Sequence, residues 1–145
     1  MQKITIVMGI SCSGKSTYIN KYYSDREKFD IFEYQTKQAL HTLEDVFKYH
    51  EDCQNDFINA IKEGKDVILE HTLLKKIRRT VYLNAIREIT DVPVELVFMN
   101  PTKETHIERL KLRGFDDGEE FLEDYYEGIE FPTEDEGFKL IEVRE

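Results

Sequence analysis

The sequence predicts a three-layer α/β fold with a mainly parallel central sheet. Short, β-branched apolar runs alternate along the chain with longer segments whose apolar residues recur every three or four positions. The runs are typical of parallel strands buried on both faces, and the longer segments are typical of the helices that cover them. At 145 residues, the chain has the size of one domain, 1–145, whose core needs no disulfide or metal.

Five segments are expected to form the sheet. The strongest candidates are the apolar runs Ile4–Met8, Asp66–Glu70, Val94–Met99 and Phe138–Val143. Weak alternation in Asp30–Tyr34 predicts a strand at an edge of the sheet. In parallel sheets ligands bind at the carboxyl ends of the strands, so functional side chains are expected where these runs end.

The intervening segments are expected to be helical. Helical spacing predicts helices over Lys15–Tyr23, Lys75–Glu88, Thr102–Arg113 and Phe121–Tyr126, and two more within Thr36–Lys62. The apolar spacing of Leu40, Leu43 and Phe47 supports the first of those two, with a break expected near His50–Cys53 and a stop at Gly64. In the helix over Lys75–Glu88, Ile77, Val81, Ala85 and Ile89 lie along one side.

Acidic residues are concentrated in the last fifth of the chain. Residues 115–145 hold 13 acidic and two basic side chains, a net charge of −11, whereas residues 1–114 carry +1. An acidic run is usually a solvated face, although a regulatory tail or a site for a basic partner would look the same. The N-terminus lacks the pattern of a signal peptide, no apolar run is long enough to span a membrane, and two cysteines suggest reduced thiols. These features predict a cytoplasmic protein.

Residues 9–17, Gly-Ile-Ser-Cys-Ser-Gly-Lys-Ser-Thr, match the pattern G-x-x-x-x-G-K-[ST] of a phosphate-binding loop. In this loop the backbone amides surround a phosphate chain, the lysine contacts the β- and γ-phosphates, and the hydroxyl after it holds Mg²⁺. We therefore expect a nucleoside triphosphate, ATP with Mg²⁺, to bind a P-loop fold here. Its expected contacts are Gly9, Ser11, Cys12, Ser13, Gly14, Lys15, Ser16 and Thr17.

Three further groups carry candidate chemistry. Glu70 ends a strand at the expected ligand edge, where a carboxylate holds Mg²⁺ beside Ser16 or accepts a proton. Arg109 and Arg113 lie four apart in a lid region of about 102–117, where guanidinium groups offset charge on a moving phosphoryl group, or they are solvated surface residues. A basic cluster consists of Lys75, Lys76, Arg78 and Arg79. It could attract an anionic acceptor, or it could simply be the solvated start of a helix. The four histidines, His41 among them, share no metal-ligand spacing.

Taken in order, these segments resemble the kinase domain of the polynucleotide 5′-kinase family, of the phage and the animal repair types. Besides the phosphate loop, the similar stretches are Gly64–Thr72 with the arginines at 78 and 79, Val92–Glu95, Arg109–Arg113 and Phe131–Phe138. The resemblance implies a three-layer P-loop NTPase/kinase fold and transfer of the ATP γ-phosphate to a nucleic-acid 5′-hydroxyl. It also implies that Lys15, Arg109 and Arg113 are catalytic.

The acceptor side departs from this family. The family's Arg-Asp pair after the second strand corresponds to Ile31–Gln35, where the Asp falls on Tyr34 or Glu33. The Asp beside Thr72 is replaced by Glu70 or His71. Glu33 is the expected base, with Asp30 as a second candidate. The alternatives are a kinase of a small alcohol, such as a nucleoside or sugar, and a nucleotide-binding protein that has lost transfer chemistry.

Overall fold

A computed structural model describes residues 1–38 and 42–145, so the predictions at Leu40 and His41 lie outside the described residues. The elements, in order, are β1 Ile4–Met8, α1 Lys15–Tyr22, β2 Glu27–Asp30, α2 Ile31–Thr36, α3 Leu43–Lys62, β3 Val67–His71, α4 Lys76–Arg87, β4 Val94–Met99, α5 Lys103–Leu112, α6 Gly118–Gly128, the 3₁₀ helix η1 Glu134–Glu136, and β5 Lys139–Val143.

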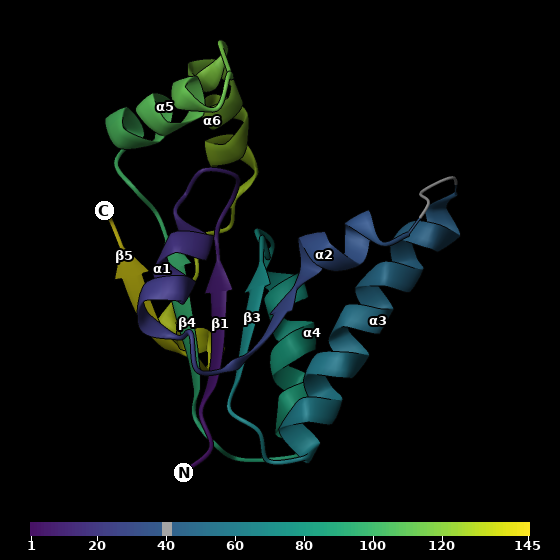
Figure 1. Ribbon diagram of the computed structural model, residues 1–145. Coiled ribbons are helices and arrows are strands. Elements are labelled where there is room, and N and C mark those ends of the chain that lie inside the picture. The colour runs from purple at the N-terminus through teal and green to yellow at the C-terminus, as the bar shows by residue number, and fades with distance from the viewer. Residues whose placement is uncertain (39–41) are drawn as a thin grey trace.

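Five parallel strands form one sheet in the order β2-β3-β1-β4-β5. The three inner strands consist almost wholly of buried residues. One face packs on α1 through Ile19, and the opposite face packs on α3 and α4 through residues such as Phe57 and Ile86. Figure 1 shows α5 and α6 stacked beyond the carboxyl ends of β1 and β4. The predicted α/β fold with a parallel sheet is confirmed, and its ligand edge lies under α5.

The second strand differs from its prediction. β2 ends at Asp30, and the segment expected to be an edge strand continues as α2. The reason is the side chain of Asp30, whose Oδ1 accepts the backbone N–H of Phe32 at 2.9 Å and so caps a helix. β2 does lie at an edge of the sheet, and its register pairs Asp30 with Glu70.

The expected break near His50–Cys53 is also wrong, because α3 runs without interruption to Lys62. A capping box between Thr42 and Asp45 starts this helix, and neither glycine nor proline interrupts it. The stop at Gly64 is confirmed, with a φ of +80° just after the helix.

The side of α4 that carries Ile77 and Val81 is exposed, at 66% and 45%. The buried side instead carries Tyr82, Leu83, Ile86 and the guanidinium of Arg79. α6 is longer than its predicted core, whereas the ends of the remaining elements lie within a residue or two of expectation.

Candidate nucleotide-binding site

The phosphate loop connects β1 to α1 at the carboxyl edge of the sheet, and its geometry requires both glycines. A Cβ on Gly9 would lie 2.5 Å from Ser13 Oγ and 3.2 Å from the backbone oxygen of Met99. Gly14 has a φ of +98°, a left-handed conformation that favours glycine, and a Cβ there would lie 3.3 Å from Arg109 Nη1. Ser13 Oγ is buried without a hydrogen-bond partner among the described residues. A tight loop with an unpaired hydroxyl and the amino end of a helix fits a phosphate chain.

Lys15 lies under this loop rather than in solvent. Its Nζ donates to the carbonyl oxygens of Gly9 at 2.6 Å and Ile10 at 3.0 Å, and Lys15 as a whole is only 6% exposed. Burial lowers the pKa of Lys15 to about 8, although the carboxylates of Glu70 and Asp30 work in the opposite direction. The ammonium is thus poorly solvated, and a phosphate bound in the loop would stabilise its charge.

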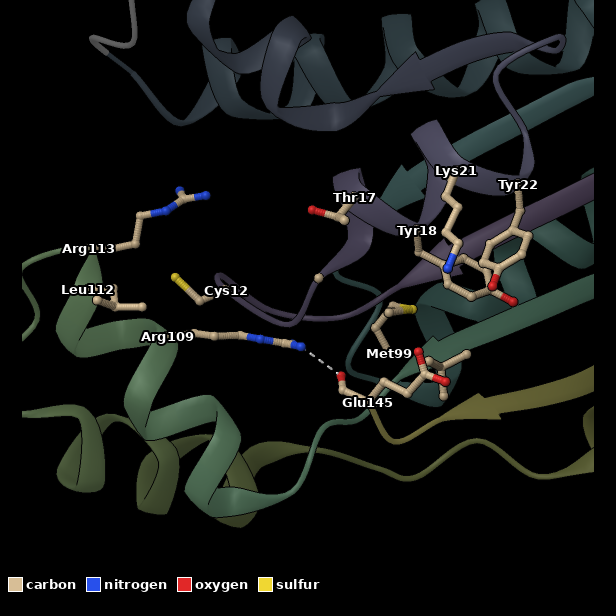
Figure 2. Close-up of a pocket in the computed structure, with 12 residues that line it drawn as sticks. Cys12, Thr17, Tyr18, Lys21, Tyr22, Met99, Arg109, Leu112, Arg113 and Glu145 are labelled. Carbon is tan, nitrogen blue, oxygen red and sulfur yellow. Dashed lines mark hydrogen bonds between the residues drawn. The ribbon is translucent and has the colours of Figure 1, made fainter.

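Two side chains of α5 contact the outside of the loop. Nε2 of the buried His106 lies 2.8 Å from the carbonyl oxygen of Ser11. Arg109 donates through Nη1 to the carbonyl oxygen of Ser13 at 3.2 Å and through Nη2 to that of Glu145 at 3.0 Å. Figure 2 shows the Arg109 guanidinium turned toward Glu145, with the second of these hydrogen bonds dashed. The loop is therefore held by the helix that was predicted to be a lid.

Ser16 and Glu70 meet where the metal is expected. Ser16 Oγ lies 3.0 Å from Glu70 Oε2, and Lys28 Nζ forms an ion pair with Glu70 Oε1 at 3.1 Å. Asp30, the register partner of Glu70, has a raised pKa because it is partly buried and faces that carboxylate. Mg²⁺ bound with a nucleotide takes one or two protein oxygens besides phosphate and water oxygens, so Ser16 and Glu70 fit that role. The described residues contain no group of three His, Cys, Asp or Glu that could hold a metal alone.

Two cavities flank the phosphate loop. The one in Figure 2, of about 430 Å³, lies between α1, the end of β4 and the lid. The other, of about 440 Å³, lies over Lys15 and Glu70 and is bordered by the rings of Phe32 and Phe115. Arg113 is exposed and borders both cavities. The loop residues that line both are Cys12, Gly14 and Thr17.

The structure separates the two candidate bases. Asp30 is partly buried, and its charge acts on the pKa of Lys15. Glu33 lies in the first turn of α2 and is exposed. Neither carboxylate lines these two cavities, but Asp30 lies beside Glu70, which does. His71 is buried, stacks against His50 at 5.6 Å between ring centroids, and has a pKa lowered to about 3 chiefly by burial. A neutral imidazole packed among aromatic rings is a poor base at neutral pH.

The basic cluster does not act as one surface. Lys75, Lys76 and Arg78 are exposed at the start of α4. Arg79 is fully buried, and its Nε lies 2.8 Å from Glu136 Oε1. It also donates to the carbonyl oxygen of Leu73 at 2.9 Å. Arg79 is therefore not available to an acceptor, and three cations remain.

Sequence reasoning missed His106, Lys28, Phe32 and Phe115. The first two act through partners distant in sequence: His106 contacts a residue 95 positions away, and Lys28 pairs with Glu70 on the neighbouring strand. The two phenylalanines look like ordinary core residues in the sequence. No short motif marks any of the four.

The comparisons with known proteins agree with this geometry. The AAA_33 family, described as an AAA domain, matches residues 4–125, and the chain belongs to it. A sugar kinase from Janibacter sp. HTCC2649 is similar in structure, with a TM-score of 0.67 at 18% identity over 98% of this chain and 86% of that one. A gluconokinase from Sinorhizobium meliloti 1021 has a TM-score of 0.58 at 22% identity, over 98% and 82%.

The third structure is the Pnkp1/Rnl/Hen1 RNA repair complex, with a TM-score of 0.68 at 16% identity over 90% of this chain and 47% of that one. At these identities the likenesses establish the α/β P-loop fold. No curated protein matches the sequence. None of the described helices combines the length and apolarity that crossing a membrane requires.

Proposed function

We propose that this protein is an ATP- and Mg²⁺-dependent kinase that phosphorylates the hydroxyl group of a small molecule. The observation that carries the proposal is the pair of cavities that flank the phosphate loop and share lining residues there. The cavity beside α1 takes the nucleoside, and the cavity over Lys15 and Glu70 takes the γ-phosphate and the acceptor. Between them the loop amides hold the α- and β-phosphates.

In this proposal each polar group has a separate task. The acceptor oxygen bonds to the γ-phosphorus while the bond to the β–γ bridging oxygen breaks, and ADP leaves. The Asp30 carboxylate takes the hydroxyl proton, for which its raised pKa suits it. Lys15 and Arg113 offset charge on the transferred group, and Arg109 keeps the loop in place. Ser16 and Glu70 would hold Mg²⁺, which would supply positive charge beside the phosphates.

The size of the second cavity favours a small acceptor. About 440 Å³ lies within the range of small-molecule sites, and the γ-phosphate uses part of it. Phe32 and Phe115 supply apolar edges suited to the carbon skeleton of an alcohol. The structural likeness to a sugar kinase and a gluconokinase supports the same class of acceptor.

A nucleic-acid 5′-hydroxyl is the second candidate acceptor. The exposed Lys75, Lys76 and Arg78 follow the carboxyl end of β3 and would contact a phosphate backbone leading to the site. The likeness to the RNA repair complex supports this candidate. The third alternative, nucleotide binding without transfer, was suggested by the missing Asp of the Arg-Asp pair. If Asp30 serves as the base, that reason no longer holds.

An acceptor screen with γ-labelled ATP distinguishes these functions. We expect label on members of a panel of sugars, sugar acids, polyols and nucleosides, and none on 5′-hydroxyl DNA or RNA oligonucleotides. Asp30→Asn should lower the rate by about 10²–10⁴-fold, whereas the matched Glu33→Gln should change it little. Label only on oligonucleotides, reduced by Lys75→Ala/Arg78→Ala, would favour the second candidate. ATP binding without label on any acceptor would contradict the proposal.

A further inference from the structure

His106 connects the lid helix α5 to the outside of the phosphate loop. Its side chain is buried, with 1% of the residue exposed, and it reaches back 95 positions to the Ser11 carbonyl oxygen at 2.8 Å. Because a carbonyl oxygen can only accept, Nε2 must carry the hydrogen in this contact. The contact is therefore a hydrogen bond from the imidazole N–H to the backbone of the loop.

The position of this hydrogen bond matters because a trans peptide is planar. The C=O of Ser11 and the N–H of Cys12 belong to one peptide unit and point in opposite directions. A donor on the outer side of the Ser11 carbonyl therefore turns the Cys12 amide toward the inside of the loop. Arg109 acts likewise one turn further along α5, since its bond to the Ser13 carbonyl turns the Gly14 amide inward.

Cys12 needs such support more than its neighbours do. It has a φ of +63°, which costs a residue with a side chain about 1–2 kcal/mol. Gly14 adopts its positive φ without that cost. A free loop would relax at Cys12 first, and the amide would leave the cradle. The hydrogen bond from His106 acts on the peptide that precedes this residue.

We propose that His106 is a positioning residue of the nucleotide site: through the Ser11 carbonyl it holds the Cys12 amide toward the β-phosphate and so couples the seating of α5 to nucleotide binding. This inference rests on the proposed binding of ATP, but not on the acceptor or on transfer. The effect of His106 on affinity should be limited to nucleotides that have a β-phosphate. The affinities for ATP and ADP should therefore depend on His106 equally, and AMP should not respond.

Three substitutions test the proposal by calorimetric titration with ATP, ADP and AMP. His106→Gln places an amide N–H near the position of Nε2, so its ATP and ADP dissociation constants should remain within about threefold of wild type. His106→Asn places its amide nearer the position of Nδ1, too short to reach Ser11. His106→Asn and His106→Ala should therefore weaken ATP and ADP binding by about tenfold, the worth of one hydrogen bond.

Equal affinities in the Gln and Asn variants would overturn the proposal, and so would weakening of ATP alone. A wild-type protein that does not bind ATP would instead contradict the proposed function. Hydrogen exchange on the wild-type protein covers the case in which the variants fold poorly. Saturating ADP should slow exchange of the Cys12 amide strongly, and an unchanged rate at Cys12 would overturn the proposal.

Discussion

At the scale of a single residue, the surroundings of Lys15 favour the binding of an anion. Its Nζ has exchanged water for two backbone carbonyls, and the poor solvation lowers its pKa to about 8. The γ- and β-phosphates would stabilise the ammonium charge in place of the water that burial excludes. Binding should therefore raise the pKa of Lys15, and the affinity for ATP should depend on pH in a defined direction.

Above pH 8 the free protein loses the Lys15 proton while the complex retains it. The dissociation constant of ATP should rise about tenfold per pH unit there, with about one proton taken up per ATP at pH 9. Below pH 7 Lys15 is already charged, and its proton uptake should vanish. Calorimetry in two buffers of different ionisation enthalpy measures this uptake, and Lys15→Met should abolish it. A pH-independent affinity between pH 8 and 9.5 would show that Lys15 does not contact the phosphates.

The candidate site was predictable where spacing within one segment defines it. The loop glycines, Lys15 and Ser16 follow from a local pattern, and Glu70 follows from the end of an apolar strand. The candidate base was less accessible, because choosing Asp30 over Glu33 requires knowing that β2 ends at Asp30. The role of His106 could not be predicted, because nothing in the sequence around an isolated histidine indicates a partner 95 positions away.

At the scale of elements, α4 shows that apolar spacing alone does not define the buried side of a helix. Ile77 and Val81 lie along one side of α4, yet the side that carries Arg79 faces inward. Arg79 is buried because Glu136, on η1, offers it two carboxylate oxygens at 2.8 and 3.1 Å. Burial alone would raise the pKa of Glu136, but the hydrogen bonds from Arg79 and Thr133 outweigh it and lower the pKa. The pairing of distant residues overrode local hydrophobicity.

This ion pair should be a main link between α4 and the segment that leads into β5. Glu136→Gln would leave the Arg79 charge buried without its counter-ion, which should lower the free energy of unfolding by about 3 kcal/mol. The melting temperature should then fall by about 6–12 °C. The matched control is Glu134→Gln on the same 3₁₀ helix, where the side chain is exposed and the change should be within about 1 kcal/mol. Equal melting temperatures for the two variants would contradict this role.

The sequence otherwise predicted which segments form helices and which form strands, with one clear exception. The segment after Asp30 alternates like a strand, but a single side-chain cap converts it into α2. Short segments carry little periodicity, so one capping interaction decides between the two outcomes.

At the scale of the whole molecule, the acidic residues 115–145 form part of the fold rather than a tail. Their apolar side chains, such as Leu122 and Phe138, are buried, and β5 pairs with β4 along the full strand. The acidic side chains are mostly exposed, many of them on α6 and η1. Figure 1 shows α6 beside the lid helix α5. Under the proposed function, a surface of this charge beside the site would repel a polyanionic acceptor.

The proposed function requires that the phosphate loop bind the triphosphate of ATP. The most direct measurement is a calorimetric titration of Mg·ATP into the wild-type protein, with Lys15→Met as the matched variant. We expect saturable heat with one ATP per chain, and an affinity at least about tenfold weaker in the variant, because a charge-assisted contact is lost. The absence of saturable heat in folded wild-type protein, or equal affinities in the two proteins, would contradict this expectation.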